Sequence, residues 1–131
     1  MNKKLVEVVA AVIENENNEI LCALRSPIMT LPNMWEFPGG KVEEGESLYT
    51  AIEREIKEEL KCSIKAIEII GENRHEYEKI IVNLTAIKCN LVEGEPVADE
   101  HSKLIYLNKE NLESLVWAPA DIPLVKKVIN I

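Results

Sequence analysis

Apolar residues gather in two runs near the start of the chain, with a polar turn between them. The first run covers residues 4–14 and the second covers residues 19–25, and three asparagines lie within residues 15–18. Apolar runs of this length, bounded by turn residues, are typical of strands that are largely buried. The pattern therefore predicts a hairpin, followed by a proline-containing loop over residues 26–33.

The middle of the chain predicts a short strand, a tight turn and a helix. Residues 35–41 begin with apolar side chains and contain a glycine pair, which lets the backbone turn sharply and expose its polar groups. Ser47 is a suitable N-cap for the helix that follows, and Lys61 falls just past its end, where a positive φ is usual. A lysine in that left-handed conformation costs about 1 kcal/mol. The apolar stripe of the helix is formed by Leu48, Ile52, Ile56 and Leu60.

The second half of the chain predicts more strands and two further helices. The predicted strands cover residues 63–70, 79–89 and 104–107. Asn108 can cap a brief helix that runs to Leu115, and Asp121 precedes a C-terminal helix. Strands and helices do not alternate as regular βαβ units, which favours an α/β sandwich with a mixed β-sheet over a doubly wound sheet.

Length and composition indicate one ordinary hydrophobic core. The chain has 131 residues, of which 47% are hydrophobic, so it is long enough for one domain and too short for two. We expect a single domain over residues 1–131, with Trp35 and Trp117 in its core, and either a monomer or a homodimer.

The chain is acidic, and most of its negative charge is concentrated in one segment. The formal net charge is −8, and residues 43–59 alone contain seven acidic residues against Arg54 and Lys57. Because nucleic-acid polymers are bound mainly through positive charge, this balance argues against DNA or RNA as partners.

The number and setting of the cysteines indicate the cellular compartment of the protein. Cys22, Cys62 and Cys89 are odd in number, widely spaced and set in apolar segments, which predicts buried, reduced thiols and a cytoplasmic location. No stretch is long and apolar enough to predict a membrane span, so no membrane partner is expected.

Helical geometry brings three carboxylates together beside the apolar stripe. With Glu55 at zero, Glu58 lies at about −60° and Glu59 at about +40° around the helix axis. Arg54 and Glu58 are spaced i, i+4 and can pair, whereas Glu55 and Glu59 at the same spacing repel each other. A hard divalent cation such as Mg²⁺, with Mn²⁺ as an alternative, would remove that repulsion and could bridge carboxylates to substrate phosphates. Glu53 and Lys57 fall on the opposite face, where we expect solvated side chains.

The same segment resembles the Nudix box, G-x5-E-x7-R-E-U-x-E-E-x-G-U, in which U is apolar. Gly40 opens the match, Lys61 replaces the second glycine, and Cys62 occupies the final apolar position. The remaining matching positions are Glu46, Arg54, Glu55, Ile56, Glu58 and Glu59. Within the family the chain looks most like the MutT and CTP-pyrophosphohydrolase branch, because of residues 35–41 and the tail over residues 118–123. The resemblance implies an α/β/α sandwich with a mixed sheet and a Mg²⁺-dependent hydrolase.

By this resemblance, one group of residues carries the chemistry. The metal ligands would be the Gly39 carbonyl, Glu55, Glu58 and Glu59, with Glu100 as a further ligand or, equally, part of an exposed acidic loop. Glu55 would also be the base for the attacking water, and Arg54 would orient it. Glu46 would support the metal site or hold the loop. Lys41 would stabilise the phosphate leaving group or the geometry of the loop.

A second group would contact the rest of the substrate. Arg25 could bind phosphate or be a surface residue, and Tyr77 could stack on a base. Asp121 matches a tail position at which MutT enzymes read the base, and its ionised carboxylate would only accept hydrogen bonds, which favours an amino donor; alternatively it is only a helix N-cap. His75 and His101 make no ligand pattern and are expected at the surface or in hydrogen bonds.

Three functions are compatible with these residues. The leading hypothesis is a metal-dependent pyrophosphohydrolase that converts a nucleoside triphosphate, such as oxidised dGTP or a CTP-type nucleotide, to monophosphate and pyrophosphate. The alternatives are a Nudix hydrolase of another diphosphate-linked nucleotide, such as a nucleotide sugar or dinucleoside polyphosphate, and a catalytically silent nucleotide-binding domain. The intact set of acids and Arg54 argues against the silent domain.

Overall fold

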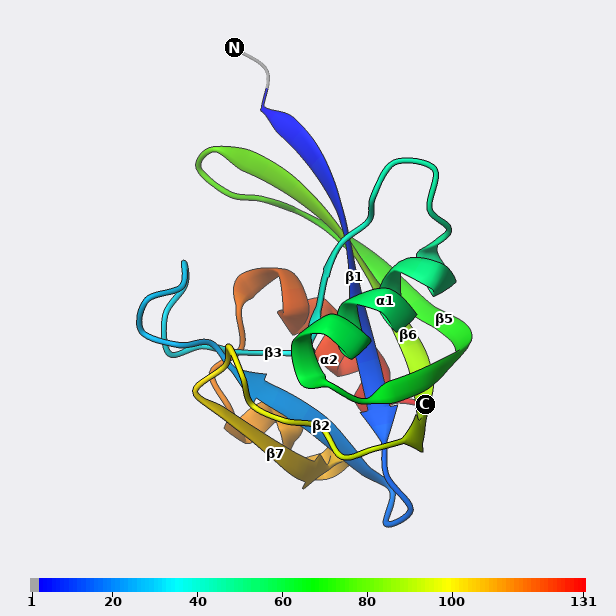
Figure 1. The fold of residues 1–131 in the computed structure, drawn as a ribbon. Helices are drawn as coiled ribbons and strands as arrows, with labels where there is room; N and C mark the ends of the chain where they lie inside the picture. The colour runs from blue at the N-terminus through cyan, green and yellow to red at the C-terminus, as the bar shows by residue number, and fades with distance from the viewer. Residues whose placement is uncertain (1–2) are drawn as a thin grey trace.

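A mixed sheet forms the centre of the molecule in the computed structural model, which describes residues 3–131. β1 (Lys4–Glu14) runs parallel to β6 (Ile80–Glu93) along its whole length and antiparallel to β2 (Glu19–Leu24) and β4 (Gly39–Lys41) (Figure 1). The remaining strands are β3 (Trp35–Glu36), which pairs with β2, β5 (Ser63–Glu76), which pairs with β6, and β7 (Lys103–Asn108), which pairs with β2. Met1 and Asn2, which the predicted domain includes, lie outside the described residues.

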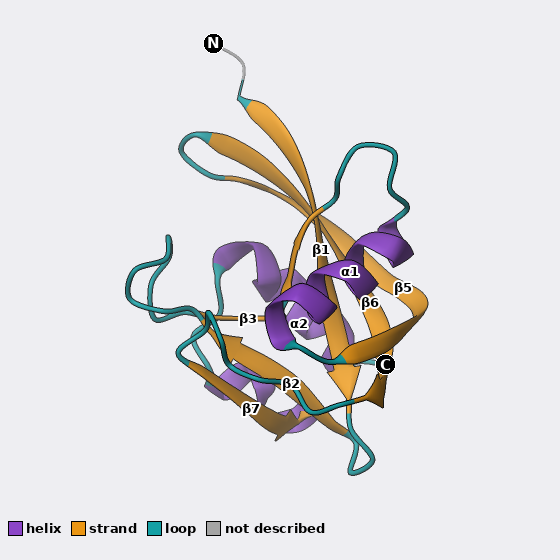
Figure 2. Ribbon diagram, viewed as in Figure 1, coloured by secondary structure: helices purple, strands orange, loops and turns teal. Residues whose placement is uncertain are grey.

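Both faces of β1 are buried over residues 9–13, so the sheet carries a helical layer on each side there. Alternate side chains of a strand point to opposite faces. One face of β1 packs against α1 (Leu48–Leu60) through Val9, Ala11 and Ile13. The other packs against α2 (Ile122–Ile129) through Ala10 and Val12. Figure 2 shows α1 in front of the sheet, and the predicted α/β/α sandwich is confirmed.

The ends of α1 follow the sequence prediction. The Ser47 hydroxyl accepts a hydrogen bond from the Thr50 backbone N–H at 3.1 Å, which makes Ser47 the N-cap. Lys61 ends the helix with φ of 58°, in the left-handed region. Its ammonium group donates to the Glu58 carbonyl at 2.7 Å, which satisfies one of the last carbonyls of the helix.

Lys61→Gly is expected to stabilise the fold by about 1 kcal/mol, because glycine adopts positive φ without a Cβ penalty. The melting temperature should rise by roughly 3–5 °C, as measured by circular dichroism. Lys57→Gly, at an exposed position inside the same helix, should lower it by a similar amount. A lower melting temperature for Lys61→Gly would mean that the bond to the Glu58 carbonyl outweighs the backbone strain.

Several predicted elements differ from the structure. The β5–β6 hairpin extends further than predicted, to Glu76 and Glu93, because backbone pairing continues where the side chains are polar and exposed. The segment Lys109–Ser114 is a 3-10 helix, and the Asn108 side chain makes no capping hydrogen bond. Glu53 is not simply solvated, since its carboxylate accepts a hydrogen bond from the Ala66 N–H at 2.9 Å.

The burial of the tryptophans and cysteines agrees with the sequence predictions more closely than the element boundaries do. Trp117 is buried, whereas Trp35 is only partly buried. All three cysteines are buried and unpaired, and burial raises the pKa of Cys22 and Cys89 to about 12. None of the helices within residues 3–131 has the length and apolar character needed to cross a membrane.

Candidate active site

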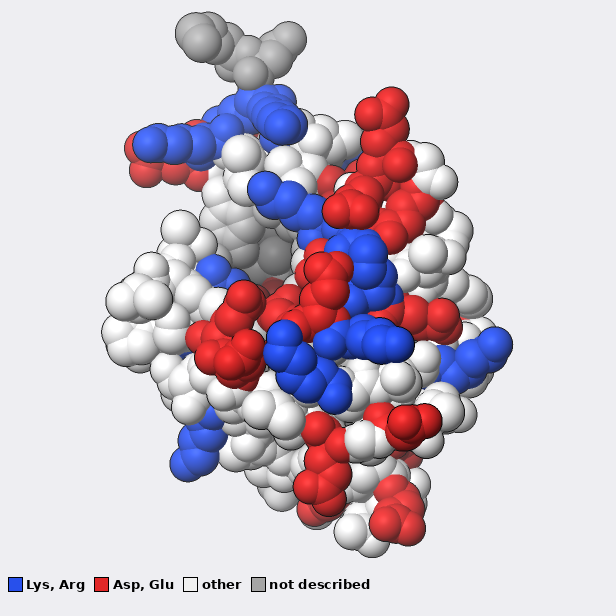
Figure 3. All heavy atoms as spheres, viewed as in Figure 1, with Lys and Arg blue, Asp and Glu red and all other residues white. Residues whose placement is uncertain are grey.

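A cleft of about 780 Å³ opens between α1, β4, the loop over residues 26–33 and the segment that leads into α2. Eight of the candidate catalytic, metal-binding and substrate-binding residues line it: Arg25, Gly39, Lys41, Glu55, Glu59, Tyr77, Glu100 and Asp121. Figure 3 shows a hollow in this face, with acidic and basic side chains gathered beside it over α1. Arg54 and Glu58 in α1, and Glu46 in the loop before α1, are not among the residues that line the cleft.

Arg54 is the centre of an ion-pair network that holds α1 to β4 and to the loop between them. Its guanidinium contacts Glu46 at 2.6 Å, Glu55 at 2.9 Å and Glu58 at 2.9 Å. It also donates to the Lys41 carbonyl at 3.1 Å. These carboxylates raise the pKa of Arg54, and the hydrogen bond from Arg54 lowers the pKa of Glu46 to about 2. The contacts favour the interpretation in which Glu46 holds the loop and Arg54 orients Glu55.

The prediction of a tight turn at the glycine pair is wrong, because Gly39 and Gly40 lie in the extended strand β4 and pair with β1. Their lack of a side chain instead lets the backbone lie closer to its neighbours than any side chain would permit. A Cβ at Gly40 would overlap the Glu55 carboxylate, and a Cβ at Gly39 would overlap the Val9 carbonyl in β1. The Ala11 N–H donates to Pro38 and the Val42 N–H donates to Glu7, so antiparallel alternation predicts that the Gly39 and Lys41 carbonyls point away from β1. The Lys41 carbonyl does so, since it contacts Arg54.

Acidic side chains crowd one end of the cleft. Glu59 is partly buried, and this burial, followed by the nearby carboxylates of Glu36, Glu55 and Glu100, raises its pKa to about 7, although His101 acts in the opposite direction. Glu100 is exposed and lines the cleft, so its loop reaches this end. Carboxylates that face one another across a partly buried space are expected to bind a cation, because each one otherwise makes its neighbours harder to ionise.

The donor atoms at this end fit Mg²⁺ or Mn²⁺. They are carboxylate oxygens and, by the alternation above, the Gly39 carbonyl, which hard divalent ions prefer. Within residues 3–131, however, no three His, Cys, Asp or Glu side chains already converge as a metal cage. One reason is that Glu58, with a side chain 61% exposed, is paired with Arg54. Such an open arrangement suits Mg²⁺, which usually keeps water and phosphate oxygens among its ligands.

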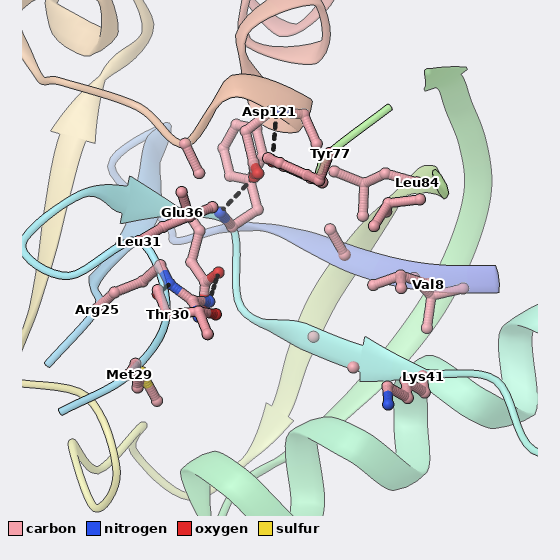
Figure 4. Close-up of a pocket in the computed structure, with 18 of the residues that line it drawn as sticks. Val8, Arg25, Met29, Thr30, Leu31, Glu36, Lys41, Tyr77, Leu84 and Asp121 are labelled. Carbon is pink, nitrogen blue, oxygen red and sulfur yellow. Dashed lines mark hydrogen bonds and ion pairs between the residues drawn. The ribbon is translucent and has the colours of Figure 1, made fainter. Parts of the chain in front are cut away.

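Arg25 is already engaged by the protein. It contacts Glu36 at 2.7 Å, and it donates to both the backbone carbonyl and the hydroxyl of Thr30, at 2.6 and 3.0 Å. Figure 4 shows these three side chains together on one wall. Arg25 therefore supports the loop over residues 26–33, while the exposed Lys41 presents its ammonium group at the opposite side of the cleft.

The other end of the cleft is apolar and holds one buried carboxyl group. The Tyr77 hydroxyl accepts a hydrogen bond from the Ala120 N–H at 3.1 Å, and the phenol ring lines the cleft beside His75. Asp121 is 5% exposed, and its carboxyl accepts a hydrogen bond from the Phe37 N–H at 3.0 Å (Figure 4). It makes no side-chain capping bond, so the N-cap interpretation is wrong. The carboxyl turns toward the sheet because Phe37 offers it a buried donor.

Burial changes the protonation of Asp121. It raises the pKa to about 8, against the smaller effect of the Phe37 hydrogen bond. The raised pKa therefore favours the protonated carboxyl near neutral pH, in contrast to the ionised carboxylate expected from the sequence. A protonated carboxyl both donates and accepts hydrogen bonds.

Two residues of the site, Glu36 and His101, were not predicted from the sequence to bind metal or substrate. Glu36 accepts from Arg25 and contacts His101 at 2.8 Å. The His101 side chain is fully buried, so the expectation of a hydrogen-bonding role is confirmed and that of a surface position is wrong. The signal that could have drawn attention to Glu36 is an acidic residue between two aromatic residues, just before the glycine pair.

Comparisons with known proteins agree with this geometry. The NUDIX domain matches residues 4–128. The CTP pyrophosphohydrolase of Escherichia coli K12 is 37% identical over 94% of this chain and 90% of its own. An 8-oxo-dGTP diphosphatase of Haemophilus influenzae is 29% identical over 99% of this chain and 96% of its own. The solution structure of a MutT protein of the Nudix family from methicillin-resistant Staphylococcus aureus shares 46% identity, with a TM-score of 0.80 and 98% of each chain covered. The chain therefore belongs to the Nudix hydrolase family.

Proposed function

We propose that this enzyme hydrolyses nucleoside triphosphates to a nucleoside monophosphate and pyrophosphate with the help of a divalent metal ion. The observation that carries the proposal is the division of one cleft into an acidic end with oxygen donors and an apolar end with a buried carboxyl group. A nucleoside triphosphate has the same division, with a charged phosphate chain and a flat base. Relatives named for CTP and for 8-oxo-dGTP support this substrate class.

The acidic end is proposed to hold the metal. Nudix hydrolases depend on a divalent metal, generally Mg²⁺. The residues that would hold it are the Gly39 carbonyl, Glu55, Glu58, Glu59 and Glu100, after Glu58 turns away from Arg54. Bound there, Mg²⁺ or Mn²⁺ would neutralise phosphate charge and help to orient the attacking water.

The side chains around the metal divide the remaining work. Glu55 is held by Arg54 and lies against the backbone of Gly40, so its position is fixed and it is the proposed base for the water. Lys41 is exposed at the cleft wall, makes no ion pair within residues 3–131, and is proposed to stabilise the leaving phosphates. Arg25 is proposed to act on the substrate through the wall it supports, and Glu46 through Arg54.

The apolar end is proposed to hold the base, with Tyr77 and Asp121 as its contacts. Because Asp121 is protonated near neutral pH, it offers a donor as well as an acceptor. We also propose a cytoplasmic location, since all three cysteines are unpaired thiols.

Asp121→Asn should become more stable than the wild type as the pH rises. The pKa of Asp121 is raised in the fold from 3.8 to about 8, so its stabilising effect is complete below pH 4 and is lost as the pH rises through 8. Asparagine does not ionise, so the difference should reach roughly 2–5 kcal/mol at pH 8 and then stay constant. Melting temperatures of both proteins from pH 5 to pH 9 measure it. Parallel curves would show that Asp121 ionises normally.

The same variant tests base recognition. Near pH 6.5 both side chains offer a donor and an acceptor, so we expect the same ranking of kcat/KM for CTP, dGTP and oxidised dGTP. At pH 9 the wild type becomes an acceptor only, and its ranking should shift toward bases with an amino donor. An unchanged wild-type ranking at both pH values would remove Asp121 from base recognition.

A nucleotide screen with chromatographic product analysis tests the proposed function. Nucleoside triphosphates should give monophosphate and pyrophosphate as the first products, and added chelator should stop the reaction. Orthophosphate as the only first product, or full turnover in chelator, would refute the proposal. Turnover only of nucleotide sugars or dinucleoside polyphosphates would favour that alternative, and binding without hydrolysis would identify a silent domain.

A further inference from the structure

His101 lies between two carboxylates that come from different walls of the cleft. Its Nε2 atom is 2.8 Å from Glu36 in β3, and its Nδ1 atom is 3.6 Å from Glu59 in α1. The histidine side chain is fully buried. Burying an imidazole costs free energy unless its ring nitrogens are hydrogen-bonded. The two carboxylates are the partners that can satisfy them.

The two ring nitrogens have different surroundings. Glu36 also accepts a hydrogen bond from Arg25 at 2.7 Å, so its carboxylate acts as an acceptor and the Nε2–H of His101 is the donor. Nδ1 has no hydrogen-bond partner within residues 3–131. A small rotation of Glu59 would bring its oxygen to about 3.2 Å or less, the range of a hydrogen bond. When both ring nitrogens of His101 carry a proton, the Nδ1–H donates to the Glu59 carboxylate. Nδ1 is thus available to Glu59.

A chain of contacts runs from Glu36 to the opposite wall of the cleft. Glu36 pairs with Arg25, and Arg25 holds Thr30 through its backbone carbonyl and hydroxyl. The residue after the histidine, Ser102, donates its N–H to the Leu24 carbonyl at 3.0 Å, which fixes the backbone beside His101 to β2. One continuous path therefore joins Glu59 at the acidic end to the loop that carries Thr30.

We propose that His101 is a positioning residue that holds the Glu59 carboxylate in place and connects it, through Glu36 and Arg25, to the substrate-lining loop. The inference rests on the proposed function, because Glu59 is a metal ligand only there. Ligating carboxylates are commonly oriented by a hydrogen bond from a neighbouring side chain, and loss of that partner typically weakens metal affinity by 10- to 100-fold. A histidine needed only for packing would affect stability alone.

Two substitutions separate the two contacts of His101. In His101→Gln the side-chain amide lies near the position of Nε2, so the contact to Glu36 is kept and that to Glu59 is lost. In His101→Asn the amide lies near the position of Nδ1, so the contact to Glu59 is kept and that to Glu36 is lost. Mn²⁺ affinity is measured by electron paramagnetic resonance on the full chain without nucleotide, together with melting temperature, kcat and KM.

His101→Gln should bind Mn²⁺ about 10-fold more weakly than the wild type, with nearly unchanged KM at saturating metal. His101→Asn should keep its Mn²⁺ affinity, but its KM for the nucleotide should rise severalfold as the Thr30 wall loosens. Equal Mn²⁺ affinities in both variants, or equal losses in both, would overturn the proposal and leave His101 a packing residue.

Glu59→Gln, measured in parallel, keeps this inference separate from the proposed function. If Glu59→Gln weakens Mn²⁺ binding and His101→Gln does not, only the role of His101 is refuted. If Glu59→Gln binds Mn²⁺ like the wild type, the assignment of the metal ligands in the proposed function fails first.

Discussion

Glu55→Gln is expected to lower kcat by about 100-fold or more while the protein stays folded. Glutamine has nearly the size of glutamate and can still accept a hydrogen bond from Arg54 through its amide oxygen. It also fits beside the backbone of Gly40, where the carboxylate now lies. What it cannot do is accept a proton from water or contribute a negative charge to a metal ion. The rate is measured at saturating Mg²⁺ and nucleotide, and circular dichroism checks the fold.

Glu44→Gln is the matched control, because it removes the same charge from an exposed residue of the same segment that does not line the cleft. Glu53 is unsuitable as a control, since its carboxylate holds the Ala66 backbone. The control should keep the wild-type rate. If Glu55→Gln also turns over normally while folded, the acidic end of the cleft is not where water is activated.

Arg54→Lys is expected to lower kcat by roughly 10- to 100-fold, even though the positive charge is kept. Arg54 contacts Glu46, Glu55 and Glu58 at once, and its planar guanidinium suits this fork of carboxylates. A lysine ammonium is a single point of charge and cannot reach all three. Glu55 would lose its fixed orientation, so kcat should fall more than KM rises.

The measurement compares kcat and KM for Arg54→Lys with those for Lys57→Arg, the reverse change at an exposed position of the same helix. The control should behave as the wild type. Wild-type kcat in Arg54→Lys would show that charge alone is needed and that the network around Arg54 does not orient Glu55.

Local sequence patterns predicted the part of the site that lies on one helix. The 3.6-residue period placed Glu55 and Glu59 at the border of the buried stripe, and both side chains are partly buried beside the cleft. The i, i+4 pair of Arg54 and Glu58 is also present. These contacts depend only on helix geometry, which the spacing of residues determines.

The contacts that the sequence did not predict join distant parts of the chain. His101 meets Glu36 across 65 positions, and Asp121 meets Phe37 across 84. No periodicity indicates such pairs, because they arise only after the sheet has formed. Protonation of Asp121 was missed for the same reason, since it follows from burial by segments far away in sequence.

A crystal structure with Mn²⁺ and a non-hydrolysable nucleoside triphosphate analogue tests the division of the cleft most directly. Anomalous scattering should locate Mn²⁺ at the acidic end, bound by oxygens from the proposed set that includes Glu55 and Glu59, with the triphosphate beside it. The base should lie against Tyr77 and Asp121. Mn²⁺ bound elsewhere, or a base placed at the acidic end, would contradict the proposed site.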